Sequence, residues 1–221
     1  MGKLSDIGTI KQILARHGFS FSKALGQNFL INPTVSPKMA ELCGAGQENT
    51  GVLEIGPGIG VLTCELAKRA PKVVAVELDK RLIPILSENL ADFNNVKIIN
   101  DDIMKVDLKK LLKAEFSGMN VVVCANLPYY ITSPVLMRLL EERLGLDAIT
   151  VMVQKEVAQR LCAGAGSRKT GSISLAVNYY AEPELLFGVK KGSFMPEPKV
   201  DSAVVKLNVR KSPPCKVLSE E

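Results

Sequence analysis

GVLEIGPGIG, residues 51–60, is the stretch that decides the fold. A short apolar run enters three glycines at alternate positions, and a helix is predicted over residues 61–69. Strand, glycine turn and helix form the first half of a nucleotide-binding βαβ unit, where glycines let the backbone approach a ligand closely. The spacing is GxGxG, and Val61 stands where a dinucleotide fingerprint requires its last glycine. The stretch therefore predicts an α/β fold and disfavours a dinucleotide ligand.

Acidic residues follow the next two predicted strands, which cover residues 72–76 and 96–99. Glu77 ends the first of them, 21 residues after Gly56. A carboxylate at this place can accept hydrogen bonds from both hydroxyls of a ribose. After the second strand, Asp101 or Asp102 can meet the amino group of a cofactor adenine while Ile103 packs on the ring. Together these residues predict a site for a nucleoside.

VVVCANLPYY, residues 121–130, is where the chemistry is predicted. Its apolar, mostly β-branched run is typical of a buried parallel strand. The end of such a strand delivers Asn126, Leu127, Pro128 and Tyr129 to the crevice where open α/β sheets bind ligands. An amide oxygen, a backbone carbonyl fixed by proline and an aromatic face suit a flat ring held by its exocyclic amine.

The rest of the chain extends this α/β pattern. Residues 3–17 predict a short amphipathic helix, with His17, the only histidine, favourably placed at its C-terminal end. Further helices are predicted over residues 80–90, 133–140 and 155–162, and a fifth strand over residues 148–153. The stretches 172–180, 184–191 and 202–210 are strand-like and predict a final antiparallel element that closes the sheet.

Composition excludes several classes of protein. The 221 residues are 47% hydrophobic, and no apolar run approaches the roughly 18 residues of a membrane span. The N-terminus lacks the apolar core of a secretory signal, so a cytoplasmic location is expected. The five cysteines have neither a disulfide pattern nor metal-ligand spacing, so no metal is expected. A net charge of +5 is compatible with a polyanionic partner.

Taken together, EIGPGIG, Glu77, Asp102 and NLPY resemble S-adenosylmethionine-dependent methyltransferases, and more closely the ribosomal RNA adenine dimethyltransferases of the small subunit. The similarity includes LGQNFL at 25–30 and GSFMPEPKVDSAV at 192–204, and it covers about residues 21–210. It implies a Rossmann-like class I methyltransferase fold, with a seven-stranded, mostly parallel sheet whose last strand is antiparallel. It also implies methyl transfer from S-adenosylmethionine to the N6 amine of adenines in small-subunit ribosomal RNA.

The resemblance assigns a role to each matched residue. Asn28 and Leu30 would cover the methionine end of the cofactor, and Tyr129 and Phe194 would sandwich the target adenine. The implied cofactor-binding residues are Asn28, Leu30, Gly56, Gly58, Glu77, Asp102, Ile103 and Asn126, and the implied catalytic residues are Asn126, Leu127, Pro128 and Tyr129. Basic side chains expected to contact the RNA backbone are Lys23, Arg168, Lys169, Lys190 and Lys191.

An adenine amine is a poor nucleophile because its lone pair is delocalised into the ring. The Asn126 amide oxygen and the Leu127 carbonyl can accept the two amine hydrogens and aim the lone pair at the donated methyl group. No strong base is required, because the methylated amine is acidic and releases its proton afterwards. A target adenine must also be unstacked, and Tyr129 can replace its stacking partner.

Domain organisation and partners follow from the same resemblance. Residues 1–210 are expected to form a monomeric methyltransferase domain with an N-terminal helical extension. Family members usually continue into a small helical domain, so residues 211–221 are expected to be a linker to a domain that this chain lacks. Two other functions stay open: a macrolide-resistance type of adenine methyltransferase acting on large-subunit RNA, and a non-catalytic RNA-binding assembly or transcription factor with the same fold.

Overall fold

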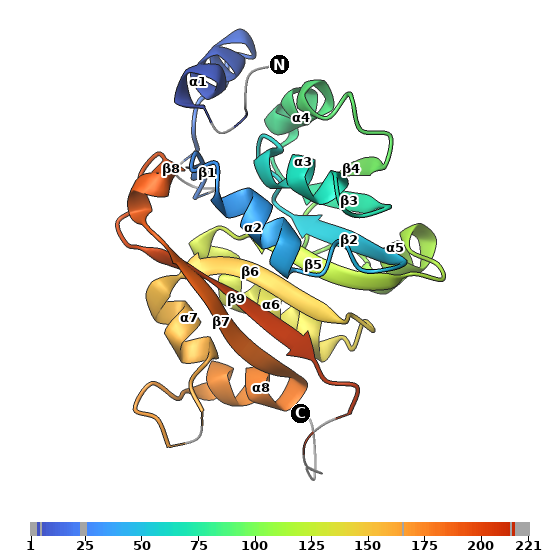
Figure 1. Cartoon of the computed structure of the whole chain (residues 1–221), viewed down its shortest axis with the longest axis vertical. Helices are drawn as coiled ribbons and strands as arrows, with labels where there is room; N and C mark the ends of the chain where they lie inside the picture. Colours follow the sequence, from blue (N-terminus) through green and yellow to red (C-terminus); the bar gives the residue numbers. More distant parts are fainter. Residues whose placement is uncertain (1–3, 5, 23–25, 165, 213, 215–221) are drawn as a thin grey trace.

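The computed structural model of the chain describes residue 4 and residues 6–22, 26–164, 166–212 and 214. A seven-stranded sheet in the order β4-β3-β2-β5-β6-β9-β7 crosses the fold (Figure 1). β9 is antiparallel to both of its neighbours, whereas the other pairs are parallel, so the predicted sheet with an antiparallel last strand is confirmed. Its strands are β2 (Thr50–Ile55), β3 (Val73–Glu77), β4 (Val96–Asn100), β5 (Asn120–Asn126), β6 (Ala148–Gln154), β7 (Ala181–Val189) and β9 (Ser202–Val209).

Helices cover both faces of this sheet. The largest hydrophobic cluster joins one face to α5, α6, α7 and α8, and a second cluster joins the other face to α2 and α3. A third cluster packs α1 and α4 beside the glycine turn. The helices are α1 (Ile7–Arg16), α2 (Val35–Leu42), α3 (Val61–Ala67), α4 (Ile83–Asn89), α5 (Leu108–Glu115), α6 (Thr132–Glu141), α7 (Lys155–Leu161) and α8 (Ser172–Tyr180). Burial on both sides explains why the parallel strands are continuously apolar.

The prediction of a strand over residues 172–180 is wrong, because this stretch forms α8. Its first residues alternate polar and apolar, but Ile173, Val177 and Tyr180 also follow helical spacing and pack on the main core. The Ser174 hydroxyl accepts a hydrogen bond from the Gly171 N–H at 3.1 Å and donates one to the Arg160 carbonyl at 2.6 Å. Local capping and contact with α6 and α7 therefore favour the helix.

Three further elements lie in stretches with no predicted structure: α5, β1 and β8. α5 begins after Asp107, whose carboxylate accepts a hydrogen bond from the Lys110 N–H at 2.9 Å. β1 (Phe29–Leu30) pairs antiparallel with β8 (Phe194–Met195) in a separate two-stranded sheet. This small sheet joins the LGQNFL and FMPEPKVDS motifs, which are far apart in the sequence. Short 3₁₀ turns complete the fold: η1 (Lys80–Leu82), η2 (Tyr129–Ile131) and η3 (Lys191–Ser193).

We expect Gly51→Ala to destabilise the fold, because a Cβ at Gly51 would lie 2.6 Å from Cε1 of Phe116 and closer still to Cδ1. Overpacking of this kind costs about 1–3 kcal/mol, to be measured as a loss in the free energy of unfolding in urea. Gly46→Ala is the matched control, since Gly46 is exposed and its Cβ would meet nothing within 4 Å. Equal stabilities of the two variants would contradict this packing.

Candidate active site

A cavity of about 260 Å³ opens at the carboxyl ends of β2, β3 and β5, beside the loop that follows β4. The sequence-predicted cofactor residues all line it: Asn28, Leu30, Gly56, Gly58, Glu77, Asp102, Ile103 and Asn126. Leu127, Pro128, Tyr129 and Phe194 line it too. Residues spread over more than 160 positions of the chain thus meet in one place, which is the edge where α/β sheets bind ligands.

The glycine turn and Glu77 are joined by hydrogen bonds. Gly56 and Gly58 have φ angles of +67° and +63°, which favour glycine. The Gly58 N–H donates to Oε2 of Glu77 at 3.2 Å, and the Asp79 N–H donates to Oε1 at 2.8 Å. Burial raises the pKa of Glu77, and these two N–H groups oppose that rise. A carboxylate has about four acceptor positions, so the Glu77 oxygens can also accept hydrogen bonds from a diol.

The loop after β4 is held by a side chain that sequence reasoning missed. Arg138 of α6 donates to the Ile103 carbonyl and, at 2.7 Å, to the Val106 carbonyl. Asp102 accepts a hydrogen bond from the Met104 N–H at 2.9 Å, and the Ile103 side chain is buried. Arg138 therefore fixes the loop that carries the two residues predicted to meet an adenine. An arginine in an otherwise ordinary amphipathic helix gives no sequence signal for this role.

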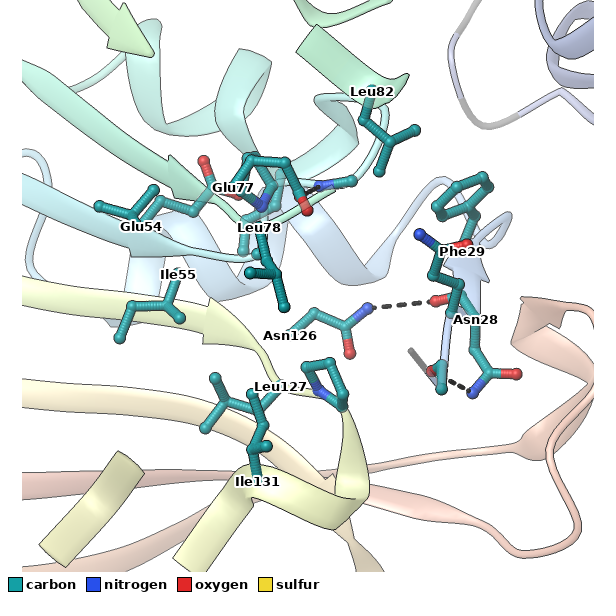
Figure 2. A pocket seen from close by; sticks show the side chains of 18 of the residues that line it. Asn28, Phe29, Glu54, Ile55, Glu77, Leu78, Leu82, Asn126, Leu127 and Ile131 are labelled. Carbon is teal, nitrogen blue, oxygen red and sulfur yellow. Dashed lines mark hydrogen bonds between the residues drawn. The ribbon is translucent and has the colours of Figure 1, made fainter. Parts of the chain in front are cut away.

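Asn126 lies between the sheet edge and the N-terminal segment (Figure 2). Its Nδ2 donates to the Asn28 carbonyl over 3.5 Å, a long hydrogen bond. This contact directs the amide nitrogen toward Asn28 and its oxygen away from it, as Figure 2 shows. The predicted role of Asn126 as an acceptor for an amine requires this orientation of the side chain.

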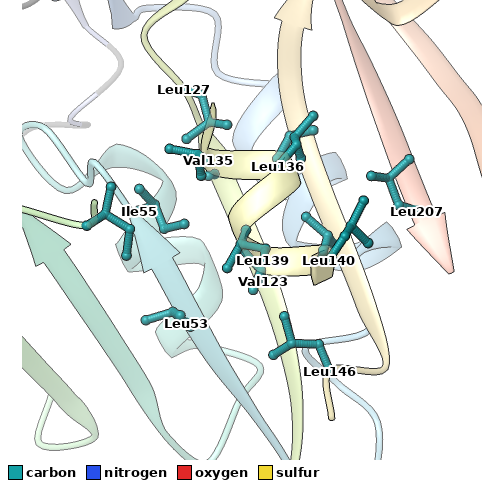
Figure 3. Packing of buried hydrophobic residues seen from close by; sticks show 14 of the residues in the cluster. Leu53, Ile55, Val123, Leu127, Val135, Leu136, Leu139, Leu140, Leu146 and Leu207 are labelled. Atoms are coloured by element: carbon teal, nitrogen blue, oxygen red, sulfur yellow. The ribbon is translucent and has the colours of Figure 1, made fainter. Parts of the chain in front are cut away.

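The backbone around the Leu127 carbonyl is fixed on both sides. The Leu127 side chain is only 1% exposed and packs in the main core with Val135 and Leu136 of α6 (Figure 3). After it, the Pro128 ring sets φ at −55°, and the Pro128 carbonyl accepts a hydrogen bond from the Ile131 N–H at 3.1 Å. Together, the core contact and the turn hold the Leu127 carbonyl at the end of β5.

The two predicted stacking residues differ in exposure. Tyr129 is half-buried, and its hydroxyl shares a 2.7 Å hydrogen bond with Ser202 at the start of β9. Burial raises the pKa of this phenol, which keeps it protonated. Phe194 is only 3% exposed and pairs with Leu30 in the small β1–β8 sheet. Most of its ring is thus covered by protein, so stacking on Phe194 stays a prediction that the geometry supports less than stacking on Tyr129.

Hydrogen bonds between polar side chains connect the N-terminal segment to the loop after β3, beside the cavity. Nε2 of Gln27 donates to Oδ2 of Asp79 at 2.8 Å, and Arg81 donates to both oxygens of the same carboxylate. The Arg81 guanidinium, the strongest of these partners, holds the pKa of Asp79 below its usual range. Arg81 also lies over the Phe19 ring, 4.9 Å from its centroid. Asp79 lies two residues after Glu77 in the sequence. This spacing gives no sign that the Asp79 carboxylate accepts a hydrogen bond from Gln27.

The four described basic residues that are predicted to contact RNA, Arg168, Lys169, Lys190 and Lys191, do not line the cavity. Lys190 pairs with Asp201 at 3.1 Å and Lys191 with Glu197 at 2.8 Å, while Lys169 donates to Gln159 at 2.5 Å. Arg168 is exposed, and Lys23 lies outside the described residues. Their contact with RNA stays a prediction.

Comparison with known proteins identifies the family. The family model described as ribosomal RNA adenine dimethylase matches residues 18–221. The chain belongs to this ribosomal RNA adenine dimethylase family. A curated member, ribosomal RNA small subunit methyltransferase A of Geobacillus thermodenitrificans, is 50% identical over 215 residues, which cover 97% of this chain and 73% of the relative. The resemblance identified from the sequence motifs is therefore confirmed.

Two solved methyltransferase structures are similar to this chain in fold. A dimethyladenosine transferase from Plasmodium falciparum is 30% identical with a TM-score of 0.72, over 83% of this chain and 64% of that one. The 23S rRNA methyltransferase ErmE is 30% identical with a TM-score of 0.71, over 86% of this chain and 73% of that one. With the sheet order, these relatives confirm the predicted class I methyltransferase fold.

Proposed function

We propose that this dimethylase family member transfers methyl groups from S-adenosylmethionine to the N6 amine of adenines in small-subunit ribosomal RNA. The observation that carries the proposal is the convergence of Glu77, Asp102 and the Asn126–Tyr129 stretch on one cavity. The enzyme is proposed to act on precursors of the small ribosomal subunit in the cytoplasm. Among the described residues, no helix is both long and apolar enough to cross a membrane.

The cavity fits the proposed cofactor in its chemistry. Glu77 offers carboxylate oxygens to a ribose diol, Asp102 offers an acceptor to an adenine amine, and buried Ile103 offers an apolar surface beside it. Gly56 leaves open space, because a Cβ there would meet nothing within 4 Å. Asn28 and Leu30 come from the segment over β5 and would cover the methionine end. S-adenosylmethionine supplies an electrophilic methyl group when it is bound.

Catalysis then depends on how the chain holds the target amine. Oδ1 of Asn126 and the carbonyl of Leu127 accept its two hydrogens, so that its lone pair points toward the donated methyl group. Because Pro128 and the core contact of Leu127 fix the turn, this geometry costs little reorganisation on binding. No buried lysine or histidine is needed nearby, since the amine loses its proton after methylation. In a second transfer the monomethylated amine has one hydrogen left, so it donates to only one of these two acceptors and releases that hydrogen as a proton after methylation.

A large-subunit RNA substrate is the second candidate, because ErmE has the same fold at 30% identity. The curated relatives named small subunit methyltransferase A are about 50% identical and favour the small subunit. A non-catalytic RNA-binding role on this fold would leave the intact Asn126–Tyr129 geometry without a purpose.

The experiment that tests the proposal supplies methyl-labelled S-adenosylmethionine with either undermethylated small subunits or naked large-subunit RNA. We expect label in adenine of the small-subunit RNA. Label in the large-subunit RNA alone would support the ErmE-like function instead. Label confined to protein, or to cytosine, would contradict both.

We expect Tyr129→Ala to weaken binding of the target base, because stacking of a base on an aromatic ring contributes about 1–3 kcal/mol. The measured effect would be a rise in KM for the RNA of roughly tenfold, with the affinity for S-adenosylmethionine kept. Tyr129→Phe keeps the ring and loses only the Ser202 hydrogen bond, so its KM should stay near the wild-type value. A wild-type KM in Tyr129→Ala would show that this ring does not stack on the target.

A further inference from the structure

Gln27 connects the N-terminal segment to the loop after β3. Its side chain is half-buried and lines the cavity. Its Nε2 donates to Oδ2 of Asp79 at 2.8 Å, and its Oε1 accepts a hydrogen bond from the Ser22 N–H at 2.9 Å. Both ends of the amide thus bind other parts of the chain, which indicates that Gln27 holds the protein in place and does not itself bind a ligand.

Asp79 is a fixed partner for Gln27. Its N–H donates to Oε1 of Glu77 at 2.8 Å, and its carboxylate accepts hydrogen bonds from the Arg81 side chain at 2.9 and 2.6 Å. Asp79 is only 6% exposed. Hydrogen bonds between a guanidinium and a carboxylate are among the strongest in proteins. Gln27 is therefore held at the end of β3, beside the residue proposed to bind the ribose.

The residue after Gln27 contacts the end of β5. The Asn28 carbonyl accepts a hydrogen bond from Nδ2 of Asn126 over 3.5 Å (Figure 2). The Asn28 side chain turns away from this contact, because its Nδ2 donates to the Gly26 carbonyl at 3.1 Å. β1, which pairs with β8, begins directly after Asn28. The Asn28 carbonyl is thus held by β1 on one side and by Gln27 on the other.

The Asn126 amide can lie in two orientations, which differ by half a turn of the side-chain amide. In one of them Oδ1 faces the target amine and accepts its hydrogen, whereas in the other the NH₂ group faces the amine and two donors meet. The Asn28 carbonyl selects the first orientation, because only the amide nitrogen can donate to it. Since 3.5 Å is at the outer limit of a hydrogen bond, a small shift of this carbonyl removes the selection.

We propose that Gln27 is a positioning residue for methyl transfer: by holding the Asn28 backbone to Asp79, it keeps Oδ1 of Asn126 directed toward the target amine. This inference rests on the proposed function, which supplies the amine. The contacts link the end of β3, where the ribose is proposed to bind, to the end of β5, where the amine is proposed to bind. Loss of Gln27 therefore lowers the rate of transfer and leaves the binding of cofactor and RNA nearly intact.

Gln27→Met tests the role, because it keeps the length of the side chain and removes both of its hydrogen bonds. We expect kcat for labelling of small subunits to fall about threefold to tenfold, the effect of one hydrogen bond, with changes below about twofold in KM for the RNA and in Kd for S-adenosylhomocysteine. Gln47→Met is the matched control at an exposed glutamine that does not line the cavity, and it should change none of these quantities.

A double variant separates this positioning role from a merely structural one. Ala at position 126 has no amide to orient, so in Asn126→Ala the added Gln27→Met change should lower the single-turnover rate no further. The same fold loss in both backgrounds would overturn the inference, as would a wild-type kcat in Gln27→Met. A Kd for S-adenosylhomocysteine raised tenfold or more would overturn it too, because Gln27 would then act by holding the cofactor.

Gln27→Glu gives a second, independent variant of nearly the same shape. It keeps an acceptor for the Ser22 N–H but places a carboxylate against that of Asp79, so kcat should fall at least as far as in Gln27→Met. A wild-type kcat in Gln27→Glu would contradict the inference even if Gln27→Met did not fold. A wild-type protein that binds S-adenosylhomocysteine but labels no RNA would instead show that the proposed function fails.

Discussion

Asn126→Ala is expected to lower kcat for methyl transfer by about 10²–10³-fold, the range seen when one fixed hydrogen-bonding group is removed from a reacting atom. The affinity for S-adenosylmethionine should fall by no more than roughly tenfold, because most of the predicted cofactor contacts come from other strands. The cause is specific: a methyl side chain cannot accept the amine hydrogen that Oδ1 of Asn126 is proposed to accept. Single-turnover rates with saturating RNA, together with calorimetry of cofactor binding, would separate the two quantities.

Asn120→Ala is the matched control for this loss. Asn120 begins the same strand, is exposed and lies at the opposite edge of the sheet from the cavity. Asn120→Ala should leave kcat and the affinity for S-adenosylmethionine unchanged. Wild-type turnover in Asn126→Ala would show that the chemistry takes place elsewhere.

Glu77→Ala is expected to raise the Kd for S-adenosylmethionine by about 10²–10⁴-fold. Two hydrogen bonds to an ionised carboxylate, at about 1.5–3 kcal/mol each, account for this range, since about 1.4 kcal/mol corresponds to tenfold. The loss has two sources in the structure. The ribose diol loses its acceptor, and the N–H groups of Gly58 and Asp79 lose the oxygens that fix the glycine turn.

Glu77→Gln tests the contribution of the negative charge. The amide keeps one acceptor oxygen, but its NH₂ group faces one of the two backbone N–H groups, that of Gly58 or that of Asp79. Its Kd should lie between those of the wild type and Glu77→Ala. Glu48→Ala, at an exposed glutamate just before β2, is the control and should bind normally. An unchanged Kd for S-adenosylmethionine in Glu77→Ala would show that Glu77 does not bind the ribose.

Much of the fold could be predicted from the sequence, because buried parallel strands are continuously apolar and end at polar residues. This pattern predicts that the residues after β2, β3, β4 and β5 lie at one edge of the sheet, and they meet there. α8 could not be recognised from periodicity alone, since its apolar residues satisfy both strand and helix spacing over its first turn. Its contacts with α6 and α7 decide between the two.

The parts that sequence patterns miss depend on contacts between distant segments. A two-residue strand such as β1 has no periodicity, and its pairing with β8 appears only when the chain is folded. Arg138 looks like a surface charge of α6 until its hydrogen bonds to the loop after β4 are seen. Glu54 lies inside the glycine motif, yet its side chain is buried, because α2 and α3 pack on that face of β2.

A crystal structure with S-adenosylhomocysteine and adenosine tests the central claim most directly, namely that methyl transfer takes place at the carboxyl end of β5. The account predicts the ribose of the cofactor product on Glu77. It also predicts the N6 atom of the adenosine within hydrogen-bond distance of Oδ1 of Asn126 and of the Leu127 carbonyl, with its ring against Tyr129. A cofactor product bound away from Glu77, or an adenosine amine directed away from Asn126, would contradict the account.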